Sequence, residues 1–306
     1  MSQPINQHWV PKFYLRYFAT PESCQTTEPQ VWIFSKDEED GDETLTNIRN
    51  ICARRYLYSP DDKAGKRNWT LETRLQQLES TYSGFWEHLA NNFIELSDDS
   101  IRKGVALFVS IMYLRHPDNL KELPNIHQNM VRLFEQAAKR TDGTPDVDSI
   151  EINGELHKID TSGWHEYCSW GKREHHQFFT NLVYSEATHL ANLLIKKRWS
   201  VVFTETPRFI TSDKPVTKQH ATKETFGFGT KGAIVSFPLS QTRLLVMDDM
   251  HNEPANQYYP LKEGNLGAFN YSIWRNGSRF MVSGRPIEQV LREIVAWADA
   301  YGAVAV

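Results

Sequence analysis

The segment Phe-Ile-Thr-Ser-Asp-Lys-Pro-Val at residues 209–216 carries polar side chains at the end of an apolar stretch. Ser212 and Asp213 follow the apolar residues, and Pro215 prevents a strand from continuing. Polar residues at strand ends commonly line the sites of α/β proteins. Asp213 could therefore serve as a metal ligand or base, and Ser212 as a hydrogen-bond donor. The alternative is a turn in which both side chains only close the strand.

Two predicted helices add charged groups at defined positions. Glu72 and Glu79 are seven residues apart, so they share one helix face. Such a pair could bind a divalent cation or divide acid and base roles, unless the face is simply solvated. Arg115 ends an apolar helix, where it must pair with an anion or reach the surface. It could hold a phosphate or oxyanion, or it could only compensate the helix dipole.

A basic stretch follows the first predicted strands. Arg54, Arg55, Lys66 and Arg67 lie near one another in the sequence, with Trp69 beside them. Cations that follow a phosphate backbone, together with an aromatic ring that stacks on a base, are typical of single-strand binding. The formal net charge of −4 argues against a general nucleic-acid coat protein, which needs a basic face. We therefore expect at most a local contact with nucleic acid or a nucleotide.

Histidines and acidic residues raise the question of a metal site. The chain has 11 histidines, but metal sites require convergent ligands rather than many candidates. Glu186 and His189 form half of a carboxylate di-iron motif, and no second half follows. The acidic loop 37–43 is a weaker candidate. Phosphate-loop, nucleophile-elbow, zinc-protease and dinucleotide signatures are absent, so the sequence identifies no cofactor and leaves a divalent metal open.

The cysteines and the apolar runs indicate the compartment. Three widely spaced cysteines without a CxxC pair favour neither a disulfide framework nor a structural zinc site. The first 15 residues lack the basic and apolar regions of a signal peptide. The longest apolar run, residues 105–114, is about half as long as a membrane helix. We therefore expect a cytoplasmic protein that does not enter a membrane.

Hydrophobic periodicity predicts the elements that must position these groups. Strands are predicted at 31–34, 47–52, 55–58, 200–204, 208–211, 233–237, 244–247 and 279–282. Helices are predicted at 11–18, 70–89, 101–115, 164–197 and 266–273, with a further helix ending near 140 and another beginning at 286. A hairpin is predicted at 150–157, because its Asn-Gly pair suits a type I′ turn.

The predicted strands lie at both ends of the chain and most helices in the middle. This order predicts an α+β fold, in which N- and C-terminal strands form a sheet beside a mainly helical block. We expect a single domain over residues 1–306, without internal repeats. Its sub-regions are N-terminal strands in 1–62, a helical block in 63–198 and a C-terminal α/β part in 199–306.

Two segments resemble a known family. The opening His-Trp-Val-Pro-Lys-Phe-Tyr-Leu-Arg-Tyr-Phe at 8–18 is similar to the start of the bacterial domain-of-unknown-function family 4238, which reads His-x-Val-Pro-x-Phe-Tyr-Leu-x-x-Phe. The segment Ile-Thr-Ser-Asp-Lys-Pro-Val at 210–216 resembles a later signature, although Lys214 stands where the family often has Asn. The stretch 47–58, the helix with Glu72 and Glu79, and residues 238–240 also match in order.

The resemblance implies a family rather than a particular activity. It also implies that a set of polar positions spread over the chain belongs to one shared site. In this sequence those positions are His8, Arg115, Ser212, Asp213 and Asn270. Of these side chains, only His8 exchanges protons near neutral pH without help.

Two hypotheses about function follow. In the first, the protein is a hydrolase with nuclease-like or phosphodiester-directed activity, with a role as a toxin or phage-defence effector. His8 is then the general acid or base, Asp213 and Glu79 orient it or hold a cation, and Arg115 steadies a phosphate.

In the second hypothesis the protein binds or senses a partner without catalysis. His8, Arg115 and Asp213 then form a buried network that connects the N-terminus to the C-terminal strands. A solvent-connected cleft would favour the first hypothesis, and buried groups that satisfy one another would favour the second. Both hypotheses predict that His8 and Asp213 lie close together.

Overall fold

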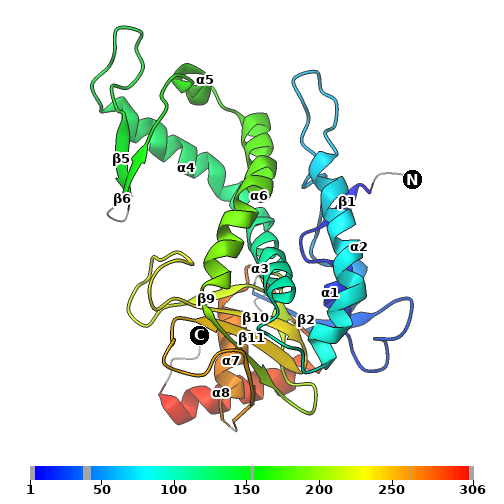
Figure 1. Ribbon diagram of the computed structural model, residues 1–306. Helices are drawn as coiled ribbons and strands as arrows, with labels where there is room; N and C mark the ends of the chain where they lie inside the picture. The colour runs from blue at the N-terminus through cyan, green and yellow to red at the C-terminus, as the bar shows by residue number, and fades with distance from the viewer. Residues whose placement is uncertain (1–3, 37–42, 153–154, 263, 303–306) are drawn as a thin grey trace.

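The two larger sheets of the protein lie between two groups of helices in the computed structural model (Figure 1). The structure describes residues 4–36, 43–152, 155–262 and 264–302. Helices α2 (Thr70–Asn91), α3 (Asp99–Leu114) and α6 (Lys172–Ile195) stand side by side above the sheets. Helices α7 (Leu266–Asn276) and α8 (Ile287–Tyr301) cover the opposite end. The predicted α+β class is confirmed.

A four-stranded antiparallel sheet joins the two ends of the chain. Its order is β3 (Glu43–Asn47), β2 (Gln30–Ser35), β13 (Phe280–Ser283) and β8 (Thr211–Ser212). Within it, Met281 of β13 lies opposite Phe34 on one side and Ser212 on the other. The prediction that N- and C-terminal strands share a sheet is therefore confirmed.

A second, five-stranded sheet comes wholly from residues 198–260. Its order is β12 (Gln257–Pro260), β7 (Arg198–Phe203), β11 (Arg243–Asp248), β10 (Ile234–Ser240) and β9 (Thr217–Gln219). Strand β12 runs parallel to β7, whereas the other neighbours are antiparallel. The short strands β9 and β12 were not predicted, because neither has the alternating apolar residues that reveal a half-buried strand.

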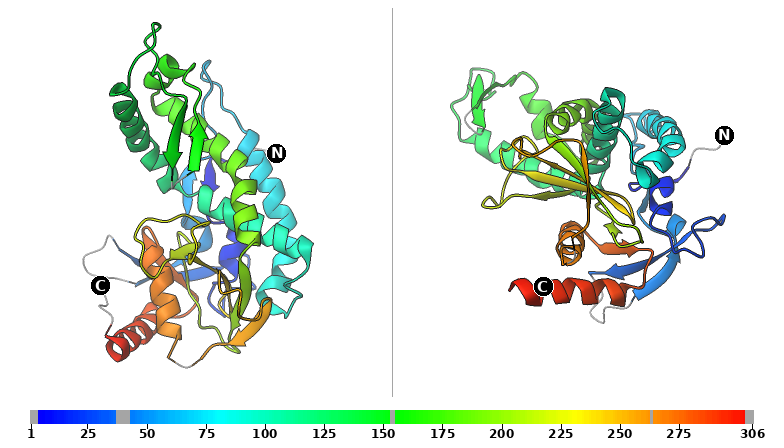
Figure 2. Two further views of the ribbon diagram at one scale, coloured as in Figure 1. Left: turned by 60° about the vertical axis from the view of Figure 1, so that its left-hand side comes forward. Right: turned by 60° about the horizontal axis from the view of Figure 1, so that its bottom comes forward.

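The part of the helical block that follows α3 extends away from the sheets as an arm (Figure 2). The arm contains α4 (Pro117–Glu135), α5 (Trp164–Cys168) and the hairpin of β5 (Ser149–Ile152) and β6 (Glu155–Lys158). The hairpin prediction is confirmed, although its Asn-Gly turn lies outside the described residues. Among the residues described, no helix is both long and apolar enough to cross a membrane.

Several predicted boundaries are wrong for identifiable reasons. The predicted strand 47–52 is instead the 3₁₀ turn Ile48–Asn50, because the Asn47 side chain accepts a hydrogen bond from the Arg49 amide and caps it. The predicted strand 55–58 ends early, since β4 (Ala53–Arg55) is followed by Tyr56 with a positive φ of 53°.

Two further boundaries also differ from the prediction. The predicted helix 164–197 is divided into α5 and α6 at Gly171, which precedes α6 with an extended backbone. Residues 208–210 are not a strand, because the amides of Arg208 and Phe209 both donate to the carbonyl of Gln241. The short strand β1 (Asn6–His8), which pairs with β4, was not predicted.

An aromatic cluster connects the N-terminal helix α1 (Lys12–Arg16) to both the helices and the second sheet. Tyr14, Trp86, Phe108 and Phe237 are buried and lie in ring contact. The Tyr14 hydroxyl donates to the carbonyl of Pro238 at 2.8 Å and lies 3.0 Å from the Thr211 hydroxyl. Polar groups within this core are thus paired, as burial requires.

Candidate functional site: a buried polar network beside a basic cleft

Asp213 is fully buried directly after β8. Its two carboxylate oxygens accept hydrogen bonds from the backbone amides of Ser278 and Arg279, at 2.9 and 3.0 Å. Burial raises the pKa of Asp213, and these backbone hydrogen bonds oppose the rise. The carboxylate therefore fixes the loop between α7 and β13, which is a long-range contact and not the local turn that was the alternative for Asp213.

Ser212 supports the same loop. It is buried, and its hydroxyl accepts a hydrogen bond from the Lys214 amide at 3.2 Å. A Cβ atom added to Gly277 would lie only 3.1 Å from the Ser212 Cβ, so the loop approaches this strand too closely for most side chains. Lys36 completes the corner, because its ammonium donates to the Gly277 carbonyl at 2.6 Å.

Arg115 forms the centre of a second buried cluster at the end of α3. Its side chain is 2% exposed and pairs with Glu79 of α2 at 2.9 Å. The guanidinium also donates to the hydroxyl of Tyr58 at 3.2 Å and to the carbonyl of His8. Tyr58 in turn donates to the Arg115 carbonyl at 2.8 Å. Arg115 is thus held by an ion pair and by the N-terminal strand, not by a helix dipole alone.

The paired carboxylates of α2 behave differently from each other. Glu72 is buried and accepts from Gln76 at 2.8 Å, whereas the Glu79 side chain stays 26% exposed while paired with Arg115. Burial raises the pKa of Glu72, although Gln76 and Arg115 oppose the effect. This face of α2 is therefore not the solvated face that was the alternative.

His8 contributes its backbone more than its imidazole. The carbonyl of His8 accepts from Arg115, while its Nε2 atom lies 3.3 Å from the carbonyl of Arg49. Burial, followed by Lys12, lowers the pKa of His8 to about 4. The imidazole is consequently neutral at pH 7.

The two clusters meet through the residue after His8. The indole of Trp9 donates to the carbonyl of Asp213 at 2.9 Å, and its ring contacts the edge of His116, with centroids 6.0 Å apart. Thus Trp9 joins the segments of His8 and Asp213, while the side chains of His8 and Asp213 take different partners. Asn270 holds a neighbouring corner, since its amide bridges the backbone of Ile210 and Arg208.

A cleft with a volume of about 490 Å³ opens beside this network. Three cationic side chains line it, together with a single carboxylate, that of Asp118. The helix α4 begins at its wall with Pro117, so the positive end of the helix dipole lies there too. We call it the basic cleft; its lining residues are Trp9, Ala53, Arg54, Pro117, Asp118, Lys121, Ser278 and Arg279.

Of the basic residues that the sequence suggested for nucleic-acid contacts, Arg54 lines the basic cleft. Arg67 instead pairs with Asp61 at 3.2 Å and lies over the ring of Tyr56. Arg55 and Lys66 are exposed side chains outside the lining of the cleft. Arg55 and Arg67 both lie over the ring of Tyr56, so two of these cations gather beside the cleft lining rather than in it.

His116 was overlooked in the sequence, although it connects the network to the cleft. It caps α4 by accepting the Asp118 amide on Nδ1 at 3.2 Å, and its buried Nε2 makes no hydrogen bond within the described residues. Burial lowers its pKa to about 4, while Asp118 opposes the effect. Proline at the first position of a helix was the available signal, because His116-Pro117 marks a helix start as well as the end of α3.

Lys121, Arg279 and Asp118 were also missed, since an isolated surface charge carries no local sequence signal. No group of three or more His, Cys, Asp or Glu side chains that could hold a metal ion occurs in the described part of the chain. The acidic loop 37–43 was a candidate, but residues 37–42 lie outside that part. Glu43 is described, and its carboxylate accepts the amide of Ile287 at 2.7 Å, at the start of α8.

Comparison with known proteins identifies a family for the chain. No curated protein and no solved structure matches the chain. One family model, described as a protein of unknown function (DUF4238), matches residues 6–286, which include β1, the Arg115 cluster and the Asp213 segment. The chain therefore belongs to the domain-of-unknown-function family 4238.

Proposed function

We propose that the protein binds a phosphate-bearing ligand, a nucleotide or the end of a nucleic-acid strand, in the basic cleft. The observation that carries this proposal is the lining of Arg54, Lys121 and Arg279 around the first turn of α4. Helix N-termini and convergent cations both stabilise phosphates. The cleft volume of about 490 Å³ lies in the usual range of small-ligand sites.

The buried network favours a binding function over a catalytic role for Asp213 and Arg115. Both carboxylate oxygens of Asp213 accept hydrogen bonds from backbone amides, and Arg115 forms an ion pair with Glu79. Each of these two groups is satisfied by its own partners in the protein interior, as structural groups are. In this proposal they hold β1, the start of α4 and the loop before β13 in register, so that the cationic side chains converge.

The binding test uses a fluorescent nucleotide and a labelled single-stranded oligonucleotide, followed by anisotropy at several salt concentrations. Arg54→Gln and Lys121→Gln should each weaken binding by about tenfold and reduce the salt slope by roughly one unit. Lys103→Gln is the matched control, because this exposed lysine lies near the far end of α3, about 18 Å along the helix from Arg115. Equal affinity in all four proteins, or no binding at low salt, would contradict the proposal.

The phosphodiester hydrolase is a second candidate, and the position of one carboxylate favours it. Asp118 is the carboxylate that lines the basic cleft, and it lies 3.4 Å from His116 and 3.8 Å from the ammonium of Lys214. A carboxylate beside bound phosphate could hold a cation or activate water.

Hydrolysis of a phosphodiester such as bis-p-nitrophenyl phosphate, with and without Mg²⁺, tests this candidate. Under it, Asp118→Asn abolishes turnover while nucleotide binding persists. His8→Ala should abolish turnover if His8 is the acid or base, as the sequence suggested. It should leave turnover intact if the hydrolase uses only the residues of the cleft. Growth of cells that express each variant measures the toxicity expected of a toxin or defence effector. No turnover by the wild-type protein leaves the binding proposal as the function.

A further inference from the structure

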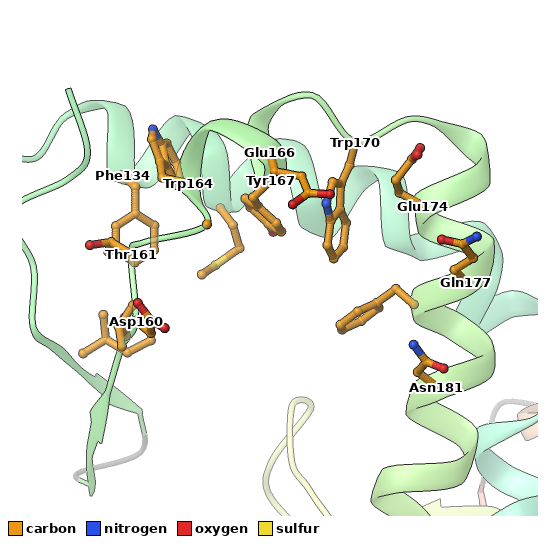
Figure 3. Close-up of a pocket in the computed structure, with 15 residues that line it drawn as sticks. Phe134, Asp160, Thr161, Trp164, Glu166, Tyr167, Trp170, Glu174, Gln177 and Asn181 are labelled. Carbon is orange, nitrogen blue, oxygen red and sulfur yellow. The ribbon is translucent and has the colours of Figure 1, made fainter. Parts of the chain in front are cut away.

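A second cavity, separate from the basic cleft, lies in the helical arm (Figure 3). It has a volume of about 660 Å³ and lies among α4, α5, α6 and the hairpin of β5 and β6. A cavity of this size is within the range that holds a small organic molecule. None of its lining residues belongs to the network or to the basic cleft.

A continuous aromatic wall borders this arm cavity. Five rings contact one another in sequence, with centroid separations of 5.8, 6.0, 4.8 and 5.4 Å. In order, they are Phe134, Trp164, Tyr167, Trp170 and Phe178. Apart from Phe134, these rings keep part of their surface exposed, and Phe178 is 40% exposed. Exposed aromatic surface concentrated around a cavity is typical of a binding site rather than of a core.

The charged residues that line the arm cavity are all acidic. They are Asp160, Glu166 and Glu174, and no Lys, Arg or His is among the described lining residues. Glu174 is engaged in the start of α6, since it accepts the Gly171 amide at 3.0 Å and pairs with Arg173. Glu166 makes a weak, exposed contact with Lys63 at 3.8 Å, and Asp160 accepts the amide of Ser162 at 2.9 Å. The wall therefore combines electron-rich ring faces with carboxylates.

The polar groups are distributed around the wall rather than on one side. In Figure 3, Trp164, Tyr167 and Trp170 form one border, Gln177 and Asn181 project from α6, and Asp160 lies across the cavity. Lys139 lies over the ring of Trp164, with its ammonium 5.2 Å from the ring centre, while it also donates to the carbonyl of Phe134 at 2.9 Å. A cation within about 6 Å of a ring face is stabilised by the ring quadrupole.

We propose that the arm cavity binds a small organic cation, a quaternary or protonated amine with an apolar body. The rings hold the apolar body and the charged head by cation–π contact, while Glu166 and Asp160 supply charge complementarity. An anionic ligand is disfavoured, because it would face three carboxylates, and the described lining residues include no Lys, Arg or His; Lys139 is outside the lining and is already bonded to the Phe134 carbonyl. This site goes beyond the phosphate-binding function and does not depend on it.

The test compares two probes of the same shape that differ by one charge. Acetylcholine and its neutral carbon isostere, 3,3-dimethylbutyl acetate, are titrated into the full-length protein and followed by tryptophan fluorescence and calorimetry. Acetylcholine should bind at least about tenfold more tightly than the isostere, as expected for cation–π contacts with several rings. Equal affinity for the two probes, or no binding of acetylcholine at millimolar concentration, would overturn the proposal.

Variants distinguish the arm cavity from nonspecific binding. Trp170→Leu and Glu166→Gln should each weaken acetylcholine binding about tenfold, without changing nucleotide binding at the basic cleft. Tyr184→Leu and Glu186→Gln are matched controls, since both are exposed residues of α6 that do not line the cavity. Glu166 is itself exposed, so its variant tests the charge even if Trp170→Leu fails to fold. Tighter binding of a trimethyllysine peptide than of acetylcholine would replace the small molecule by a protein partner.

Discussion

The indole nitrogen of Trp9 donates a 2.9 Å hydrogen bond to the backbone carbonyl of Asp213, across 204 positions of the chain. Trp9 is 5% exposed and Asp213 is fully buried, so water does not compete for this bond. Trp9 also lines the basic cleft. The bond therefore ties the N-terminal strand to the loop that carries Arg279 and sets one wall of the proposed phosphate site.

Removal of this hydrogen bond should destabilise the fold. Trp9→Phe keeps an aromatic ring but leaves the buried carbonyl of Asp213 without its hydrogen-bond donor. The free energy of unfolding should therefore fall by about 1–3 kcal/mol. Urea denaturation followed by circular dichroism measures the change. Trp69→Phe, at a half-buried indole packed on Tyr56, is the control and should change stability less. An equal loss in both variants would show that ring size, rather than the hydrogen bond, carries the effect.

Replacing only Arg115 of the Arg115–Glu79 ion pair should destabilise the fold more than replacing both partners. Arg115→Met leaves the carbonyl of His8 and the hydroxyl of Tyr58 without their donor, and a loss of about 3–5 kcal/mol is expected for breaking a buried pair. The double variant Arg115→Met/Glu79→Leu should recover part of this loss. Additive losses in the double-mutant cycle would mean that the two charges do not stabilise each other.

An exposed pair provides the comparison for that cycle. Lys103 and Asp99 are separated by 2.5 Å in α3, but their side chains are 64% and 73% exposed. Lys103→Met should change the free energy of unfolding by no more than about 1 kcal/mol, because solvent screens the pair. A loss as large as that of Arg115→Met would mean that solvent exposure does not explain why the two ion pairs differ in their effect on stability.

Local sequence patterns predicted most elements, since apolar periodicity and proline positions act over a few residues. The helices α2 and α3 and the strands β2 and β11 follow from such patterns. The errors fall where a single side chain decides the backbone, as Asn47 does when it caps the 3₁₀ turn. The order of elements predicted that N- and C-terminal strands share a sheet, but not which strands pair. The pairing of β2 with β13 depends on the rest of the fold.

The candidate site was predictable as a set of segments but not as geometry. The polar motif residues Arg115 and Asp213 stood out because charged groups beside apolar stretches require partners. Which partners they take depends on contacts such as Arg115 to Glu79, between separate helices. Lys121 and Arg279 carry no local signal, since a surface cation becomes part of a site only when folding places it beside others.

Even alanine, the smallest side chain, should destabilise the fold when it replaces Gly277. A Cβ atom there would lie 3.1 Å from the Ser212 Cβ and 3.2 Å from the Trp274 carbonyl oxygen, so the loop before Arg279 must move. Gly277→Ala should lower the free energy of unfolding by about 1–3 kcal/mol and weaken nucleotide binding at the basic cleft.

Gly84 is the matched control for that substitution. It lies inside α2, and nothing comes within 4 Å of the position that a Cβ atom would take. Gly84→Ala should therefore stabilise the protein by about 0.5–1 kcal/mol, because alanine is the better helix former. If both alanine variants gain stability, the approach of Gly277 to Ser212 is not a constraint.

His116 should make the protein less stable in mild acid. Its pKa is lowered from 6.5 to about 4 in the folded protein, so between these values the unfolded chain binds a proton that the folded chain does not. Stability from this group is present above pH 6.5 and is lost as the pH falls towards 4, by about 2 kcal/mol at pH 5. His8 acts in the same direction, whereas the raised pKa values of Asp213 and Glu72 act in the opposite one.

The difference between wild type and His116→Asn isolates this contribution, because the other groups titrate in both proteins. Asparagine can still cap α4 through its side-chain oxygen, so the helix start should persist. Urea denaturation at pH 7 and pH 5 should show a wild-type advantage that shrinks by about 2 kcal/mol on acidification. His251→Asn, at an exposed loop residue, corrects for loss of an imidazole that is not buried. An advantage that stays constant between the two pH values would mean that His116 takes up its proton as easily folded as unfolded.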